Sequence, residues 1–179
     1  MGNALEQLVA RNGAALAAAA NTSLNFEQKL QQFPYYGFIE CEIFGAAPFL
    51  MFSNNDDAVA QHFLYRQKPG FEAASMRLWV ALCRQSRMGI FDVGAFSGVY
   101  ALAARATTRS VPILAFEPAR NTFNRLVNNI WVNHFDDQIA PLNFALGSKT
   151  SRERIRHPHG VYVLGSGESI LPSVIKEAW

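Results

Sequence analysis

Residues 90–100, Ile-Phe-Asp-Val-Gly-Ala-Phe-Ser-Gly-Val-Tyr, decide the fold of this chain. A short apolar run leads into a turn with glycines at positions 94 and 98, and an alanine-rich stretch follows. This order predicts a strand, a tight loop and the start of a helix. Glycine lacks Cβ, so its backbone can take positive φ and a ligand can approach it closely. The helix start adds N–H groups and a partial positive charge. We therefore expect a ligand-binding loop here.

The residues around this loop predict a parallel sheet. Three buried strands are expected at 89–93, 112–116 and 139–146, with helices at about 98–107 and 120–133 between them. A strand–helix–strand–helix–strand order implies right-handed crossovers and parallel strands. The fold class expected is α/β, with a Rossmann-like sheet.

The N-terminal third has a different pattern. Asn21 to Asn25 separate two expected helices, and partial alternation between Phe38 and Phe52 around Gly45 and Pro48 predicts two antiparallel strands. We expect residues 1–68 to form a helical and β-hairpin extension and residues 69–179 the main domain. The helices expected in these regions cover residues 3–20, 25–32, 57–65 and 72–87, the last with Met76, Trp79, Val80 and Cys83 on its apolar face.

Composition narrows the function classes. Half of the 179 residues are apolar, 17% are charged and the net charge is +2, which suits a globular protein and gives no argument for nucleic-acid binding. No run reaches the ~18–20 apolar residues of a membrane span. Glu6 ahead of Arg11 argues against a signal peptide, so we expect a cytoplasmic protein. Cys41 and Cys83 are expected to be reduced, and the histidines lack zinc-ligand spacing, so no metal is expected.

Two carboxylates strengthen the prediction that the glycine loop binds a ligand. Asp92 ends the first strand of the sheet and Glu117 ends the second. The carboxyl ends of neighbouring parallel strands open onto one crevice, where ligands bind. Glu117 would then accept hydrogen bonds from the two hydroxyls of a ribose, and Asp92 would lie near the other end of the ligand. The alternative for Gly94 and Gly98 is a plain strand-to-helix turn.

Three motifs in order carry a family resemblance. Phe91-Asp-Val-Gly-Ala-Phe-Ser-Gly-Val-Tyr-Ala-Leu, Ala115-Phe-Glu-Pro and Asn143-Phe-Ala-Leu-Gly, with an Asn-rich helix around Asn128 and Asn129, resemble FkbM-type methyltransferases over about residues 70–148. The resemblance implies S-adenosylmethionine binding and O-methylation of a sugar, glycolipid or polyketide hydroxyl. Carried over by position, Asp92, Gly94 and Gly98 would line the methionine part of the cofactor and Glu117 the ribose, while Asn143 and Ala145 would lie near the adenine. Glu72 is similar to an acidic position of the family. The other cofactor-binding residues that the resemblance implies are Ala95, Phe96, Ser97 and Pro118.

The chain after Gly147 departs from the family pattern. No further buried strands are predicted there, so the sheet looks truncated after its third strand and the chain looks like the N-terminal part of a longer enzyme. The first strand would then present an open apolar edge able to pair with another chain. A catalytic base cannot be named. A non-catalytic module completed by a partner chain is the alternative; a nicotinamide enzyme is disfavoured because Gly94 to Gly98 lack the Gly-x-Gly-x-x-Gly pattern.

Three weaker features receive simpler interpretations. Arg152, Arg154, Arg156, His157 and His159 suit the solvated face of a short hairpin of residues 154–157 and 161–164 better than an acidic-sugar site. Gly165-Ser-Gly167 is read as a surface loop. Trp79 and Trp131, at apolar helical positions, are expected in the core.

Overall fold

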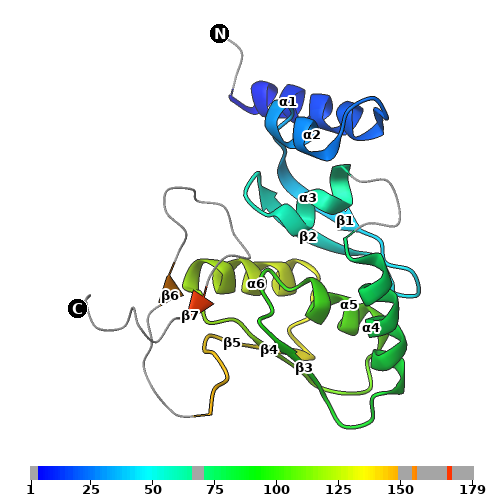
Figure 1. The fold of residues 1–179 in the computed structure, drawn as a ribbon, viewed down its shortest axis with the longest axis vertical. Coiled ribbons are helices and arrows are strands. Elements are labelled where there is room, and N and C mark those ends of the chain that lie inside the picture. The colour runs from blue at the N-terminus through cyan, green and yellow to red at the C-terminus, as the bar shows by residue number, and fades with distance from the viewer. Residues whose placement is uncertain (1–3, 66–70, 149–154, 157–168, 171–179) are drawn as a thin grey trace, which may run out of the picture.

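The structure, a computed structural model, describes residues 4–65, 71–148, 155–156 and 169–170. Figure 1 shows three layers along its long axis: two N-terminal helices, a hairpin with a short helix, and a sheet with its helices. Within the described residues, no helix combines the length and apolar character needed to cross a membrane.

The main sheet has three parallel strands. β3 (Ile90–Val93), β4 (Ile113–Phe116) and β5 (Ile139–Leu142) pair in the order β3-β4-β5, with Ile90 opposite Ile113 and Ile113 opposite Ile139. The connections contain α5 (Val99–Thr107) and α6 (Arg120–Val132). The protein is therefore an α/β protein with a Rossmann-like parallel sheet, as the alternation of elements predicted.

Among the described helices, α5 and α6 cover one face of this sheet, and Figure 1 shows both on one side of the three strands. Ile90, Ile113 and Ile139 are aligned across the strands, so they share one face, and all three are buried. Among the described strands β3 is at an edge of the sheet, and on its other face Phe91 is 63% exposed and Val93 is 59% exposed. Large apolar side chains on an edge strand are a site for pairing or aggregation.

The third strand is shorter than predicted. The apolar pattern indicated residues 139–146, but β5 ends at Leu142. Pro141 cannot donate to a ladder, and the N–H of Phe144 bonds the carbonyl of Leu142 at 3.0 Å, which turns the chain. The last four residues of that prediction are wrong.

The N-terminal elements match the predicted ones closely. They are α1 (Ala4–Ala20), α2 (Phe26–Gln32), β1 (Tyr36–Cys41), β2 (Phe49–Asn54) and α3 (Ala58–Tyr65). β1 and β2 pair antiparallel. The buried ammonium of Lys29 bonds the carbonyls of Ala19 and Tyr65, which ties the three helices together.

The long helix predicted before the sheet is α4 (Ala73–Gln85), and it packs beside α5. Met76, Val80 and Cys83 are buried as expected, and Trp79 donates its indole N–H to the carbonyl of Tyr100 at 2.9 Å. The expectation for Trp131 is wrong. It is 69% exposed, because the buried stripe of α6 runs through Leu126, Asn129 and Ile130.

The C-terminal region is described at two short strands. β6 (Ile155–Arg156) pairs antiparallel with β7 (Ser169–Ile170). A hairpin strand was expected at 154–157, and β6 lies within it. Its partner was expected at 161–164, which lies outside the described residues; the observed partner is β7, at residues 169–170. Arg152, Arg154, His157, His159 and the loop 165–167 are outside them too. Cys41 and Cys83 are both buried and free.

Candidate functional site

The glycine loop lies at the carboxyl ends of β3 and β4. The N–H groups of Gly94 and Ala95 both donate to the carbonyl of Phe116, at 2.9 Å each, and the N–H of Gly98 donates to the carbonyl of Ala95 at 2.8 Å. Three loop residues have positive φ: Gly94 at 79°, Phe96 at 53° and Gly98 at 102°. Because Phe96 has a Cβ, its left-handed backbone is strained and must be held by its surroundings.

Glu117 helps to fix the left-handed backbone of Phe96. Its side chain is buried, Oε2 accepts the N–H of Phe96 at 2.9 Å, and Oε1 accepts the N–H of Ala119 at 2.8 Å. The carboxylate therefore joins the loop after β3 to the start of α6. An ionised carboxylate offers about four lone-pair positions, and these two bonds use both of its oxygens.

The two glycines of the loop have different roles. A Cβ at Gly98 would lie 2.6 Å from Cδ1 of Leu126, so α6 packs directly on this position. A Cβ at Gly94 would meet no atom within 4 Å, and Gly94 is exposed. Gly98 is thus required by packing, as a plain turn would predict. Gly94 faces open space, which suits the close approach of a ligand.

Asp92 turns towards α5. Its Oδ2 accepts the N–H of Ala101, in the first turn of that helix, at 2.9 Å. Burial raises the pKa of this carboxyl to about 6; the bond from Ala101 opposes the rise and the charge of Glu117 adds to it. Asp92 therefore lies beside the loop as predicted, and it also stabilises the helix N-terminus that the loop leads into.

Asn143 and Pro118 lie beside Glu117. The amide of Asn143 donates to the carbonyls of Glu117 at 2.8 Å and Pro118 at 3.1 Å. Ala145 follows in the exposed segment after β5. These contacts place Asn143 beside Glu117, and they hold the backbone of Glu117 and Pro118.

Glu72 is connected to the loop through α5. Its carboxylate accepts the hydroxyl of Tyr100, in the first turn of α5, at 2.6 Å. Burial raises the pKa of Tyr100 to about 12, and the bond to Glu72 adds to the rise. Glu72 itself has φ of 42°, a left-handed conformation uncommon for a residue with a side chain.

The structure brings most of the predicted residues into one region. Asp92, the loop 94–98, Glu117, Pro118 and Asn143 share the carboxyl end of the sheet, while Glu72 joins them only through Tyr100. Sequence reasoning missed Tyr100 and did not see what Asn129 does. Asn129 is fully buried and donates its amide to the carbonyl of Ser97 at 2.9 Å. A polar residue within the buried stripe of α6 was the available signal.

A hollow of about 400 Å³ lies elsewhere, between the β1–β2 turn, α3 and the start of α4. Its lining includes Phe44, Phe63, Phe71, Met76 and Arg77, and none of the glycine-loop residues. It is therefore separate from the candidate cofactor site.

Comparison with known proteins finds similarity at the level of structure. No family model matches the chain, and no curated protein matches it. Among solved structures, the chain is similar to a SAM-dependent methyltransferase from Agrobacterium tumefaciens, with 11% identity and a TM-score of 0.42. The match covers 60% of this chain and 32% of that protein, so the matched part spans about a third of the neighbour. Strand order and direction establish the fold, and membership of the FkbM family stays a prediction.

Proposed function

We propose that this chain binds S-adenosylmethionine at the glycine loop and serves in a methyltransferase. The observation that carries the proposal is the position of Glu117. A buried carboxylate at the end of β4 lies against the glycine loop that follows β3, at the edge where parallel sheets bind nucleoside ligands. The open space in front of Gly94 gives such a ligand room.

Each end of the ligand has a matching group in the chain. The ribose hydroxyls would donate to Glu117, as charge-assisted hydrogen bonds. The methionine carboxylate would lie near the N-terminus of α5, where the helix dipole favours an anion. Since Gly94, Ala95, Phe96 and Gly98 donate their N–H groups within the protein, these four are not the donors for that carboxylate.

Bound S-adenosylmethionine supplies an electrophilic methyl group, and the family resemblance supports a hydroxyl of a sugar, glycolipid or polyketide as its acceptor. The contribution of these residues is then to position the cofactor, which is a large part of catalysis when two reactants must meet in line. We assign no catalytic base.

Titration calorimetry with S-adenosylhomocysteine and with NAD tests the proposal. We expect S-adenosylhomocysteine to bind saturably. We expect NAD to produce no heat of binding of similar size. Tight NAD binding without a response to S-adenosylhomocysteine would instead favour a nicotinamide enzyme.

A second candidate function is a non-catalytic module completed by another chain. The observation that favours it is the exposure of Phe91 and Val93 on the edge strand β3. We expect the chain to self-associate through this strand, and Val93→Lys to reduce the association because a charge on an edge strand opposes pairing.

Sedimentation velocity over a concentration series measures this association. Met88→Lys is the matched control, since Met88 is 90% exposed but lies outside the strands. Equal association of the parent and both variants would remove the argument for the second candidate.

A further inference from the structure

The strained centre of the glycine loop is held from two sides. Phe96, at φ of 53°, has its N–H bonded to Glu117. The next residue, Ser97, is fully buried, and its carbonyl accepts the amide of Asn129 at 2.9 Å. A left-handed residue with a side chain persists only where its neighbours fix it. Asn129 is therefore one of two polar side chains that flank and fix the strained position.

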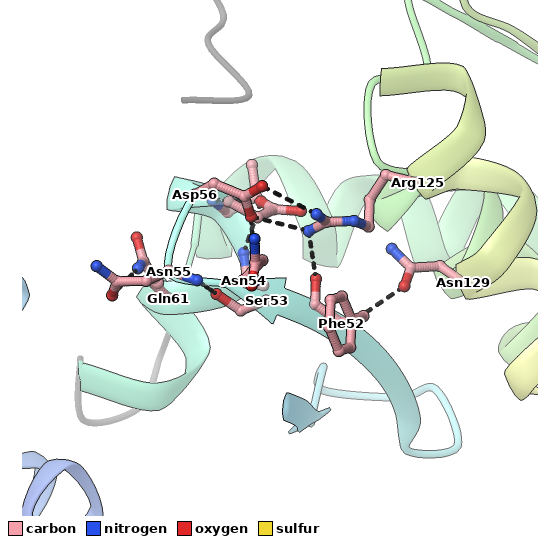
Figure 2. Close-up of polar contacts among 11 residues, drawn as sticks. Phe52, Ser53, Asn54, Asn55, Asp56, Gln61, Arg125 and Asn129 are labelled. Atoms are coloured by element: carbon pink, nitrogen blue, oxygen red, sulfur yellow. Dashed lines mark hydrogen bonds and ion pairs between the residues drawn. The ribbon is translucent and has the colours of Figure 1, made fainter. Parts of the chain in front are cut away.

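The β-hairpin determines which end of the Asn129 amide meets Ser97. Phe52 of β2 donates its backbone N–H to Oδ1 of Asn129 at 2.8 Å, as Figure 2 shows. A flipped amide would set its NH₂ against that N–H and its oxygen against the carbonyl of Ser97. Only one orientation satisfies both contacts, so a strand of the extension sets a bond in the glycine loop.

Arg125 on α6 and Asn133, the residue that directly follows α6, complete this junction. Asn133 bonds both backbone groups of Leu50, at 2.7 Å each, and Arg125 donates to the carbonyl of Phe52 at 2.9 Å. Arg125 also forms a bidentate pair with Asp56, seen in Figure 2. Residues 125, 129 and 133 are four apart, so they share one face of the helix. Their side chains hydrogen-bond the backbone N–H and carbonyl groups of Leu50 and Phe52 on the edge of β2, much as a neighbouring strand would.

A second contact joins the loop to the extension. Burial raises the pKa of Asp57, which caps α3 by accepting the N–H groups of Val59 and Ala60. The Ser97 hydroxyl beside this carboxylate opposes the rise, although the Ser97 oxygen and Asp57 Oδ2 make no hydrogen bond of standard geometry. Ser97 thus lies beside Asp57, which caps α3, and beside Asn129 of α6.

We propose that Asn129 is a positioning residue for the ligand-binding loop. Because β2 fixes Asn129, the N-terminal hairpin then contributes to the geometry of that site. Asn129 holds the Ser97 carbonyl, and β2 holds Asn129. The identity of the ligand rests on the proposed function; the positioning of the loop does not.

Two matched substitutions test this. Asn129→Asp keeps the oxygen that accepts the Phe52 N–H but loses the donor to Ser97. Asn133→Asp keeps the oxygen that accepts the Leu50 N–H but loses the donors to the carbonyls of Leu50 and Asn129. Both changes add a carboxylate to the same junction, on the same helix face, and only the first touches the loop.

The readouts are S-adenosylhomocysteine affinity by calorimetry and unfolding in urea. We expect Asn129→Asp to weaken binding tenfold or more, and Asn133→Asp to leave it within twofold at a similar or larger loss of stability. Equal losses of affinity in the two variants, or none in Asn129→Asp, would overturn the proposal. If Asn129→Asp does not fold, Asn129→Ala removes the same donor without adding charge, together with the acceptor for the Phe52 N–H.

A third readout separates this proposal from the proposed function. The amide chemical shifts of Gly94 and Gly98 in the ligand-free protein should move in Asn129→Asp and stay in place in Asn133→Asp. A parent protein that does not bind S-adenosylhomocysteine would sink the cofactor assignment, and the shifts would still decide whether Asn129 positions the loop. Unmoved shifts in Asn129→Asp would show that it does not.

Discussion

The carboxylate of Glu117 accepts the backbone N–H of Phe96 at 2.9 Å, so the residue expected to hold a ribose also fixes the loop in front of it. The two roles use the same oxygens. Replacing Glu117 by alanine would therefore remove a ligand contact and release a strained loop together, and a fall in affinity alone could not separate them.

Glu117→Gln separates the two roles when paired with altered ligands. Adenosine and 2′,3′-dideoxyadenosine differ only in the ribose hydroxyls. We expect the parent to prefer adenosine by about tenfold or more, since hydrogen bonds to a charged group contribute about 1.5–3 kcal/mol. The variant should lose most of that preference, because its neutral amide is a weaker acceptor. Calorimetry of each protein with each nucleoside measures this preference. An unchanged preference in Glu117→Gln would show that the ribose does not contact this residue.

The two loop glycines should respond differently to alanine. Gly98→Ala places a Cβ against the fully buried Leu126 at positive φ, so we expect a loss of about 3 kcal/mol in unfolding free energy. Gly94→Ala meets no neighbour, so its cost should be about 1–2 kcal/mol from backbone strain alone. Its larger effect should be on S-adenosylhomocysteine binding. Urea titration and calorimetry give both numbers, and parental affinity in Gly94→Ala would remove that glycine from the site.

Most of the main fold could be predicted because its signals are local. The apolar runs containing Ile90 and Ile113 are short and bounded by Gly89, Gly94, Pro112 and Pro118, which marks buried strands. The end of β5 could not be predicted, because the apolar run continues through Phe144 to Leu146 while the backbone turns away after Leu142. The exposure of Trp131 likewise depends on which face of α6 meets the sheet.

The relative positions of the candidate site residues were more predictable than their contacts. The spacing from Gly98 to Glu117 placed that carboxylate beside the loop, as the structure has it. The bond from Phe96 could not be foreseen, since it depends on the left-handed conformation of a non-glycine residue. The role of Asn129 depends on a strand edge 77 residues away in the chain, which no local pattern specifies.

Asp92 should give the protein a measurable pH dependence of stability. Its pKa is raised from 3.8 to about 6 by burial, with a contribution from the charge of Glu117. Because the folded state favours the protonated acid, this group stabilises the protein fully below about pH 4, and the stabilisation is lost as the pH rises through 6. The displacement corresponds to about 3 kcal/mol at most.

Asp92→Asn removes this titration and keeps an oxygen for the N–H of Ala101. We expect the parent to lose stability relative to the variant between pH 4 and 6.5, as measured by urea unfolding at several pH values. The difference between the two proteins is the relevant quantity, since the raised pKa of Asp57 affects both. Asp137→Asn is the control of opposite sign: the hydrogen bond from Arg105 lowers the pKa of Asp137, so its contribution is lost as the pH falls. Parallel stability curves for the parent and Asp92→Asn would mean that Asp92 titrates normally in the folded protein and is more open to solvent than its burial beside α5 implies.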